Sequence, residues 1–91
     1  MAAQSNPVRI LLVDDHKVLR DGLRALLECE PDLQVIGEAG TGAQAIALAG
    51  TLAPDVMVLD LGLPDINGLE VMRTLRQHNS TLRIVVLSMY S

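Results

Sequence analysis

Aromatic residues are almost missing from this sequence, whose 91 residues include one Tyr and neither Phe nor Trp. Proteins usually hold single-stranded nucleic acids by stacking the bases on aromatic side chains, which this chain cannot provide. Basic residues are in the minority, with 7 Lys and Arg against 11 Asp and Glu, so the chain has no general affinity for phosphate backbones. The composition therefore disfavours direct binding of nucleic acid by this segment.

Long apolar runs and paired cysteines are absent as well. The longest uninterrupted apolar run is residues 45–49, far below the roughly 18 apolar residues that span a membrane. Cys29 is the only cysteine, so no internal disulfide can form, and no charged and apolar leader opens the sequence. Because 49% of the residues are apolar, we expect one domain with a packed core. The short apolar runs predict a soluble chain, and the single cysteine and the missing leader predict a location in the cytoplasm.

Near-continuous apolar stretches of strand length recur along the chain. They predict four strands, the second of which is the weakest and is expected near an edge of its sheet. The predicted strands are residues 8–13, 33–39, 56–61 and 83–88. Residues 1–7, which precede the first strand, are expected to form a flexible tail.

Apolar residues at helical spacing follow the first strand. They form one stripe of an amphipathic helix, which Pro31 ends. The stripe consists of Leu19, Leu23, Leu26 and Leu27. A second helix, over residues 42–52, is predicted to begin with a capping box formed by Thr41 and Gln44.

A third helix is predicted before the last strand. Asn67 and Glu70 are expected to cap its start, and it runs to about His78. Strands and helices therefore alternate through the whole chain. Because the crossovers between parallel strands are right-handed, this order predicts an α/β fold in which helices cover the faces of a parallel sheet.

Acidic residues stand at the carboxyl ends of two apolar strands. Asp14 and Asp15 follow the first strand, Asp60 lies near the end of the third, and Ser88 ends the fourth. Open parallel sheets bind their ligands beyond the carboxyl ends of the strands, so these side chains are expected to meet in one crevice. Carboxylates at close range repel one another unless a cation lies among them, and an all-oxygen site suits Mg²⁺ or Mn²⁺. The pattern predicts a divalent-metal site that receives a phosphoryl group.

Ordinary structural roles stay open for some of these residues. Asp15 directly precedes a predicted helix, where a role as the helix cap explains it equally well. His16 is expected in the loop that enters this helix, and His78 near the end of the third helix, where the helix dipole favours a cation. Asp60 interrupts a strand that is otherwise apolar, so a carboxylate there needs a functional reason.

Three segments carry a resemblance to a known family. They are LLVDDH at residues 11–16, VLDLGLPDINGLEV at 58–71 and VVLS at 85–88. In this order and spacing they closely resemble the receiver domain of two-component response regulators, of the LuxR/NarL/FixJ type. The resemblance runs over residues 8–91 and implies a flavodoxin-like (CheY-like), doubly wound parallel sheet. It also implies that the chain stops after the fourth strand, before the fourth helix, the fifth strand with its Lys, and the fifth helix.

The resemblance implies a role for each candidate residue. Asp60 would accept a phosphoryl group from a phosphohistidine of a sensor histidine kinase. Asp15, Asp60 and the backbone carbonyl of Gly62 would ligate Mg²⁺, and Asp14 would contribute through a bound water. The Ser88 hydroxyl would bind the incoming phosphoryl oxygen. Such a chain is a phosphoacceptor rather than an enzyme, and a DNA-binding output domain outside it would regulate transcription.

Two other functions compete with this interpretation. Phosphatases of the haloacid dehalogenase type also place an Asp nucleophile beside Mg²⁺, but they need a second Asp where this chain has Gly62. The alternative that remains is a receiver-like module for interaction or dimerisation, which no longer signals by phosphorylation. An uncovered fourth strand would lie at a sheet edge, where strands pair with other chains. We therefore expect self-association, most simply as a homodimer.

Overall fold

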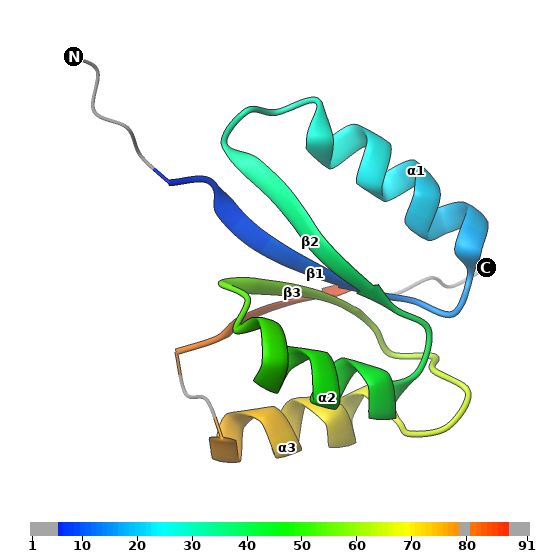
Figure 1. Cartoon of the computed structure of the whole chain (residues 1–91). Coiled ribbons are helices and arrows are strands. Elements are labelled where there is room, and N and C mark those ends of the chain that lie inside the picture. The colour runs from blue at the N-terminus through cyan, green and yellow to red at the C-terminus, as the bar shows by residue number, and fades with distance from the viewer. Residues whose placement is uncertain (1–5, 79–80, 88–91) are drawn as a thin grey trace.

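Strands and helices alternate along the chain in the computed structural model, which describes residues 6–78 and 81–87 (Figure 1). The elements are β1 (Val8–Val13), α1 (Lys17–Glu28), β2 (Leu33–Ala39), α2 (Gly42–Leu52), β3 (Val56–Asp60), α3 (Gly68–His78) and β4 (Arg83–Leu87). Their order and type are those predicted from the sequence. β3 is one residue shorter than expected, because the chain bends away from the sheet at Leu61.

The predicted tail and the predicted last strand both extend into residues outside the described part of the chain. Of residues 1–7, only Asn6 and Pro7 are described, and they have no regular secondary structure. β4 is described as far as Leu87, so Ser88 lies outside the described residues. The flexible tail and a domain that spans residues 8–91 therefore stay predictions.

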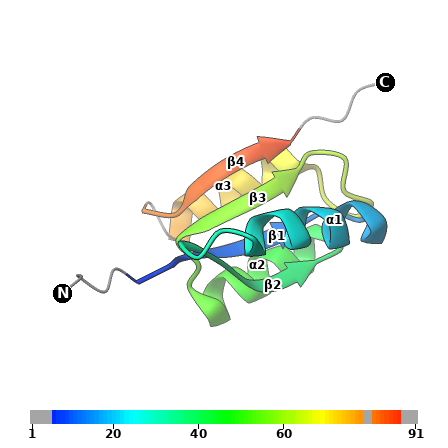
Figure 2. The same ribbon diagram turned by 90° about the horizontal axis from the view of Figure 1, so that it is seen from above.

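All four strands of the described chain pair in parallel, in the order β2-β1-β3-β4 (Figure 2). β2 lies at one edge, as its weak apolar pattern predicts, and β4 lies at the other. From β2 the chain crosses back over β1 to reach β3, so the winding direction reverses between β1 and β3. Such a reversal opens a crevice outside the carboxyl ends of the two central strands, where α/β sheets of this kind bind ligands.

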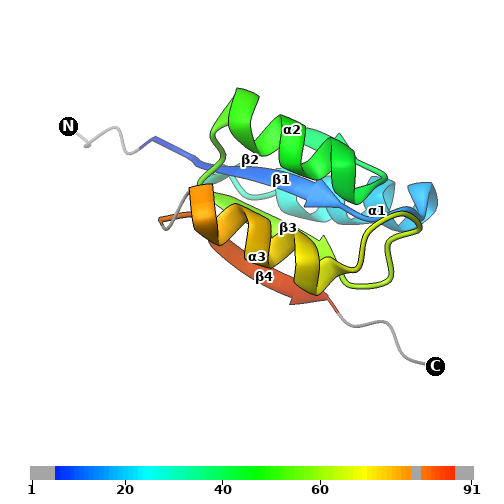
Figure 3. The same cartoon turned by 90° about the horizontal axis from the view of Figure 1, so that it is seen from below.

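The two faces of the sheet carry separate cores of different size. Figures 2 and 3 show α1 on one face and α2 with α3 on the other. The core on the α2 and α3 side consists of Leu11, Val13, Ala39, Ala45, Ala49, Met57, Leu59, Val71, Leu75 and Leu82. The core on the α1 side consists of Ile10, Leu12 and Val35. The strands serve both cores because successive side chains point to opposite faces of the sheet.

The apolar stripe of α1 is only partly buried. Leu23 and Leu27 pack against the small core beneath the helix. Leu26, which belongs to the same predicted stripe, is 69% exposed. The physical reason is that α1 packs chiefly on β1 and β2, whereas Leu26 lies on the flank that faces an open groove.

The predicted N-caps of α2 and α3 both form. Thr41 Oγ1 accepts a hydrogen bond from Gln44 N at 3.1 Å, as the capping box predicts. The reciprocal bond differs, because the Gln44 side chain accepts from Gly40 N at 2.9 Å. At the start of α3, Asn67 Oδ1 accepts from Leu69 N at 2.8 Å. These caps fix where the two helices begin, beside the loops that follow β2 and β3.

The helices of the described chain are short, with 12 residues in α1 and 11 in each of α2 and α3. A helix that crosses a bilayer needs about 20 mostly apolar residues. Within residues 6–78 and 81–87, none of the helices combines the length and the apolar character that crossing a membrane requires.

Candidate functional site

The three predicted carboxylates come together at the carboxyl ends of the central strands. Asp14 and Asp15 directly follow β1, and Asp60 is the last residue of β3. The two strands are neighbours, with Val13 paired to Leu59, so their ends lie side by side. Among the described residues, one ligand atom from each of these three side chains and from His16 lies within 4.8 Å of the others. We call these four residues the acid cluster.

Two members of the acid cluster are buried. Asp14 is 1% exposed and Asp60 is 5% exposed, and a buried carboxylate is costly unless hydrogen bonds or a cation compensate it. Asp60 Oδ1 accepts a hydrogen bond from Gly62 N at 3.0 Å. Asp14 Oδ1 accepts one from His16 N at 2.6 Å, but Asp14 Oδ2 is buried and has no hydrogen-bond partner within the described part of the chain. The cluster therefore holds a buried acceptor that the described residues leave unsatisfied.

His16 brings an imidazole into contact with these acids. It is the N-cap residue of α1, in an extended backbone conformation, and its side chain forms no capping hydrogen bond. Its Nδ1 lies 2.9 Å from Asp14 Oδ1 and 3.1 Å from Asp15 Oδ1. The hydrogen bond with Asp14, followed by the charge of Asp15, raises the pKa of His16 above its ordinary value. The predicted place of His16 in the loop before α1 is confirmed, but its membership of the acid cluster was not predicted.

The alternative role of Asp15 as a helix cap does not fit the structure. α1 begins at Lys17, and its N-cap position belongs to His16 rather than to Asp15. The Asp15 side chain instead lies in the acid cluster, within 3.1 Å of the His16 ring. Asp15 is therefore a neighbour of the His16 ring and not the cap of α1.

An ion-pair network holds the backbone of the acid cluster against β2. The Arg20 guanidinium donates to the backbone carbonyl of Asp14 and, through Nε, to Glu38 Oε1 at 3.0 Å. Arg24 Nη1 donates to Glu38 Oε2 at 2.6 Å. The hydrogen bond from Arg24, assisted by that from Arg20, lowers the pKa of Glu38. The sequence offered one signal for this network, an acidic residue in the mainly apolar β2 with two Arg one turn apart on α1.

The loop from Leu61 to Asn67 depends on one close backbone contact. A Cβ at Gly68 would lie 2.7 Å from Leu61 Cα and 3.2 Å from the carbonyl oxygen of Asp60. Only glycine lets the first turn of α3 rest this close to the end of β3. A Cβ at Gly62 would approach Asp60 Oδ1 no closer than 3.7 Å, which is an ordinary contact. Of the two loop glycines, Gly68 is therefore the one that sterics require.

Asp65 fastens the same loop to a neighbouring helix. Its carboxylate accepts hydrogen bonds from Gly42 N at 2.7 Å and from Ala43 N at 3.0 Å, the first amides of α2. These backbone bonds lower the pKa of Asp65, and the helix dipole favours an anion there. Sequence reasoning missed this residue, because an Asp in a loop rich in turn residues carries no signal of a partner 23 residues away.

Ser88 lies outside the described residues, so its part in the site stays a prediction. Leu87, the residue before it, pairs with Asp60 across β3 and β4.

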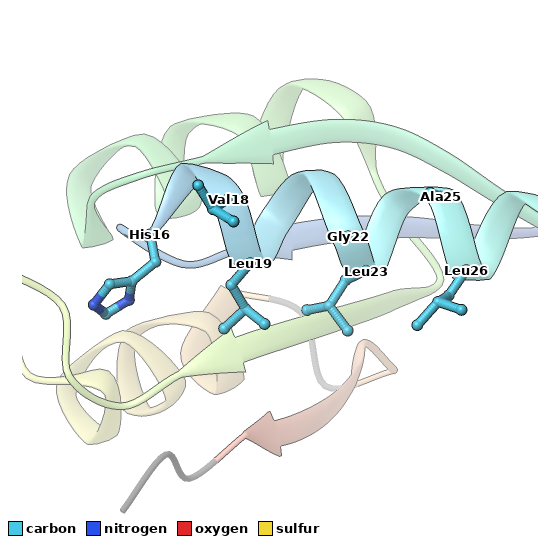
Figure 4. Close-up of a pocket in the computed structure, with 7 residues that line it drawn as sticks. All are labelled: His16, Val18, Leu19, Gly22, Leu23, Ala25 and Leu26. Atoms are coloured by element: carbon cyan, nitrogen blue, oxygen red, sulfur yellow. The ribbon is translucent and has the colours of Figure 1, made fainter. Parts of the chain in front are cut away.

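A groove of about 830 Å³ runs along the exposed flank of α1 and begins beside the acid cluster (Figure 4). Its lining is apolar apart from His16 and consists of His16, Val18, Leu19, Gly22, Leu23, Ala25 and Leu26.

A known family shares this fold. Residues 10–91 match the sequence profile described as the response regulator receiver domain. The chain belongs to this receiver-domain family. The resemblance found in the sequence is therefore confirmed, and so is the flavodoxin-like, CheY-like fold that it implied.

Curated relatives of this receiver domain include whole regulators. The nitrate/nitrite response regulator protein NarL of Escherichia coli (strain K12) is 46% identical over 86 residues, which are 94% of this chain and 40% of NarL. The DNA-binding transcriptional activator DevR/DosR of Mycobacterium tuberculosis is 48% identical over 84 residues, which are 92% of this chain and 39% of that protein. The receiver domain thus spans about two fifths of the length of these LuxR-type relatives.

Solved structures agree with this assignment. The signal receiver domain of a response regulator named NarL from Mycobacterium tuberculosis superposes with a TM-score of 0.89 at 31% identity, over 96% of this chain and 70% of that one. A LuxR-family response regulator from Aurantimonas sp. gives a TM-score of 0.88 at 38% identity, over 94% of this chain and 61% of that one. At these identities the likeness supports the family as well as the fold.

Receiver domains of this sequence type also occur beside enzymes. A protein-glutamate methylesterase/protein-glutamine glutaminase of Methanospirillum hungatei is 42% identical over 79 residues, which are 87% of this chain but only 23% of that protein. Receiver domains of transcriptional regulators are in general not enzymes themselves. The receiver domain alone therefore does not define the reaction or the output of a whole protein.

Proposed function

We propose that this receiver domain accepts a phosphoryl group on Asp60 from a sensor histidine kinase. The observation that carries the proposal is the state of Asp60, a buried carboxylate at the end of β3 with two further acids beside it. The hydrogen bond from Gly62 N to Oδ1 orients the carboxylate and leaves Oδ2 for attack on phosphorus. A bond forms between this oxygen and phosphorus, the bond from phosphorus to the histidine nitrogen breaks, and the leaving imidazole keeps the electron pair.

The acid cluster suits a divalent cation, for which Mg²⁺ is the proposed ion and Mn²⁺ the alternative. The donor set is mainly oxygen, and Oδ2 of Asp14 is a buried acceptor without a partner among the described residues. Asp15, Asp60 and the backbone carbonyl of Gly62 would hold the ion, with Asp14 acting through a bound water. When bound, the cation would neutralise charge on the carboxylates and on the transferred phosphoryl oxygens.

The remaining roles follow from the position of each residue. The Ser88 hydroxyl would bind a phosphoryl oxygen opposite the attacking carboxylate, because Ser88 follows the residue of β4 that pairs with Asp60. Asp14 and Asp15 would keep the incoming anion out of the cluster until a cation is present, since like charges repel. The phosphoacceptor unit would span residues 8–91.

The output of the whole protein is proposed from its relatives. The name of DevR/DosR describes a DNA-binding transcriptional activator, and NarL is named as a response regulator. We infer that a DNA-binding output domain, outside the segment described here, regulates transcription in response to phosphorylation of Asp60. A regulator that exchanges phosphate with a kinase and acts on DNA would work in the cytoplasm.

Self-association is a second proposal, supported by the exposed edge of the sheet. Val85 and Val86 of β4 are 50% and 39% exposed, and β4 has a neighbouring strand on only one side in the described sheet. Edge strands of this kind pair with other chains, so we expect a homodimer that forms through β4. Light scattering over a range of concentrations tests this, and a monomer at every concentration would contradict it.

Intact mass spectrometry tests phosphoacceptance. The chain is treated with a small-molecule phosphodonor and Mg²⁺, and we expect a mass gain of one phosphoryl group. The Asp60→Asn variant should show no gain. Asp21→Asn is the matched control, because Asp21 is an exposed acid of α1 that pairs only with Lys17. A receiver-like interaction module without phosphoacceptance would instead show no gain in any of the three proteins.

A further inference from the structure

The acid cluster contains an imidazole for which the phosphoacceptor reaction has no evident use. We propose that His16 is a side-chain ligand of the cluster, through Nδ1, and that it makes the cluster a site for a transition-metal ion such as Zn²⁺. The inference rests on the proposed function, because it concerns the same cation site. It adds a competing ligand class that the roles of Asp14, Asp15 and Asp60 do not include.

The two distances from the His16 ring to the acids fit coordination of these donors to one ion. Two donors that lie about 2.1 Å from a common metal are about 3.0 Å apart at a right angle and about 3.4 Å apart in a tetrahedron. His16 Nδ1 lies 2.9 Å from Asp14 Oδ1 and 3.1 Å from Asp15 Oδ1. The ring therefore already stands where a ligand shared with both carboxylates would have to stand.

The surroundings leave the ring available for this role. The His16 side chain is 65% exposed and forms no cap to α1, so no buried contact holds it in another orientation. Figure 4 shows the ring at the start of α1, turned away from Leu19 and Leu23, which line the groove. Without a metal, the same ring can share a proton with Asp14, which is the hydrogen bond that the structure contains.

The unsatisfied oxygen of Asp14 is an independent sign of a missing cation. Asp14 Oδ2 is buried without a partner among residues 6–78 and 81–87, although buried acceptors in proteins are nearly always satisfied. A cation that contacts Oδ2 as well as Oδ1 would satisfy it, whereas the existing hydrogen bonds from His16 both go to Oδ1. The imidazole alone therefore does not compensate the negative charge of the three carboxylates.

The chemical character of the fourth donor determines which ion is favoured. Mg²⁺ prefers oxygen ligands and keeps several waters, whereas imidazole suits Zn²⁺, Ni²⁺ and Cu²⁺. Adding one nitrogen to three carboxylates therefore raises the affinity for Zn²⁺ more than that for Mg²⁺. Four protein ligands also close a tetrahedral site, whereas a catalytic site keeps an open position. Zn²⁺ bound in this way would exclude the phosphoryl group, so Zn²⁺ should act as an inhibitor of phosphoacceptance.

Direct metal binding, measured without any phosphodonor, tests the inference. All proteins carry Cys29→Ser, because the exposed thiol of Cys29 could bind Zn²⁺ elsewhere. Zn²⁺ affinity is measured by competition with a chromophoric chelator and Mg²⁺ affinity by calorimetry, at one slightly alkaline pH. We expect His16→Gln to lower the ratio of Zn²⁺ to Mg²⁺ affinity by at least about tenfold. His78→Gln, which removes the other imidazole at the end of α3, should leave the ratio unchanged.

Nuclear magnetic resonance of ¹⁵N-labelled histidine identifies the ligating atom. On addition of Zn²⁺ we expect a coordination shift at Nδ1 of His16 and none at either nitrogen of His78. Equal affinity ratios in the His16→Gln and His78→Gln proteins, or a His16 ring whose Nδ1 does not shift, would overturn the inference. These results are distinguishable from failure of the proposed function, which would appear as no phosphoryl mass gain with Mg²⁺ alone.

Discussion

The two ends of the parallel strands differ in how far their charged groups are compensated by hydrogen bonds. At the amino end, Arg9 donates through Nη1 to the Ala53 carbonyl and through Nη2 to the Leu52 carbonyl, each at 2.7 Å. The backbone of Arg9 also exchanges hydrogen bonds with Asp55, whose Oδ2 accepts from Arg9 N at 2.9 Å. The Arg9 guanidinium thus satisfies carbonyls at the end of α2, which have no partner within the helix.

At the carboxyl end, charge is concentrated without full compensation. Asp14, Asp15 and Asp60 meet there, and one buried oxygen has no partner. A protein keeps such a cluster only where something other than stability maintains it, and local conflicts of this kind gather at functional sites. Polar groups therefore stabilise the amino end of this sheet, whereas those at the carboxyl end are arranged for a ligand.

Gly68→Ala tests whether the carboxyl end also has strict steric limits. The added Cβ would lie 2.7 Å from Leu61 Cα, so the loop must move, and we expect a loss of about 3 kcal/mol in the free energy of unfolding. Gly62→Ala is the matched control, since its Cβ meets only an ordinary contact, and no described glycine has a positive φ. Denaturant titration of both variants measures the difference. Equal losses would show that the close contact at Gly68 is not a constraint.

Arg9→Met tests the stabilising role of the amino end. The substitution removes two hydrogen bonds from a charged donor to the carbonyls of Leu52 and Ala53, so we expect a loss of about 2 kcal/mol. Arg73→Met is the control, because Arg73 forms only an exposed pair with Glu70 on α3 and should change stability by less than about 0.5 kcal/mol. If the two variants melt alike, the amino end does not depend on the contacts of Arg9.

Asp14→Asn tests the opposite sign at the carboxyl end. The amide keeps an acceptor for His16 N and removes one of three crowded charges, so without metal we expect a gain of about 1 kcal/mol in stability. Affinity for Mg²⁺ should fall in the same variant. Thermal unfolding with and without Mg²⁺ measures both effects, with Asp21→Asn as the control acid. A destabilised variant in the absence of metal would contradict the proposed contrast between the ends.

Asp65 is an exception to the difference between the two ends, because this acid at the carboxyl end is hydrogen-bonded to Gly42 and Ala43. Its pKa is lower in the folded chain than in the unfolded chain, so its contribution to stability is present at neutral pH. That contribution is lost as the pH falls below the ordinary Asp value and through the lower folded value. We expect Asp65→Asn to be less stable than the parent protein at neutral pH, with a difference that shrinks in acid. Denaturation of Asp65→Asn and of a control Asp32→Asn across this acid range measures the effect, and a difference independent of pH would contradict it.

Much of the fold could be predicted because local signals and tertiary structure agree. Strands buried between helices appear as apolar runs, and the caps at Thr41 and Asn67 stand where the sequence places them. Leu26 could not be assigned, since a helical stripe does not reveal how much of its width a neighbouring sheet covers. Helix periodicity describes which residues share a side of α1, whereas the sheet decides which of them are buried.

The residues of the candidate site could be predicted only where an acid lies at the end of an apolar strand. Asp14, Asp15 and Asp60 follow apolar runs, so the topology alone brings them together. Asp65 could not be assigned, because its partner on α2 is 23 residues away and is reached only through the path of the loop before α3. His16 is a neighbour of Asp14 and Asp15 in the sequence, but adjacency does not show that its ring turns toward them, as it does in the extended conformation before α1.

Chemical trapping of the phosphoryl group shows directly whether Asp60 is the phosphoacceptor. Reduction of the phosphorylated chain with borohydride converts an acyl phosphate into an alcohol, which peptide mass spectrometry then places on a residue. The account predicts that Asp60 alone is converted, and only when a phosphodonor and Mg²⁺ are both present. Conversion at Asp14 or Asp15, or of no residue while the fold is intact, would contradict it.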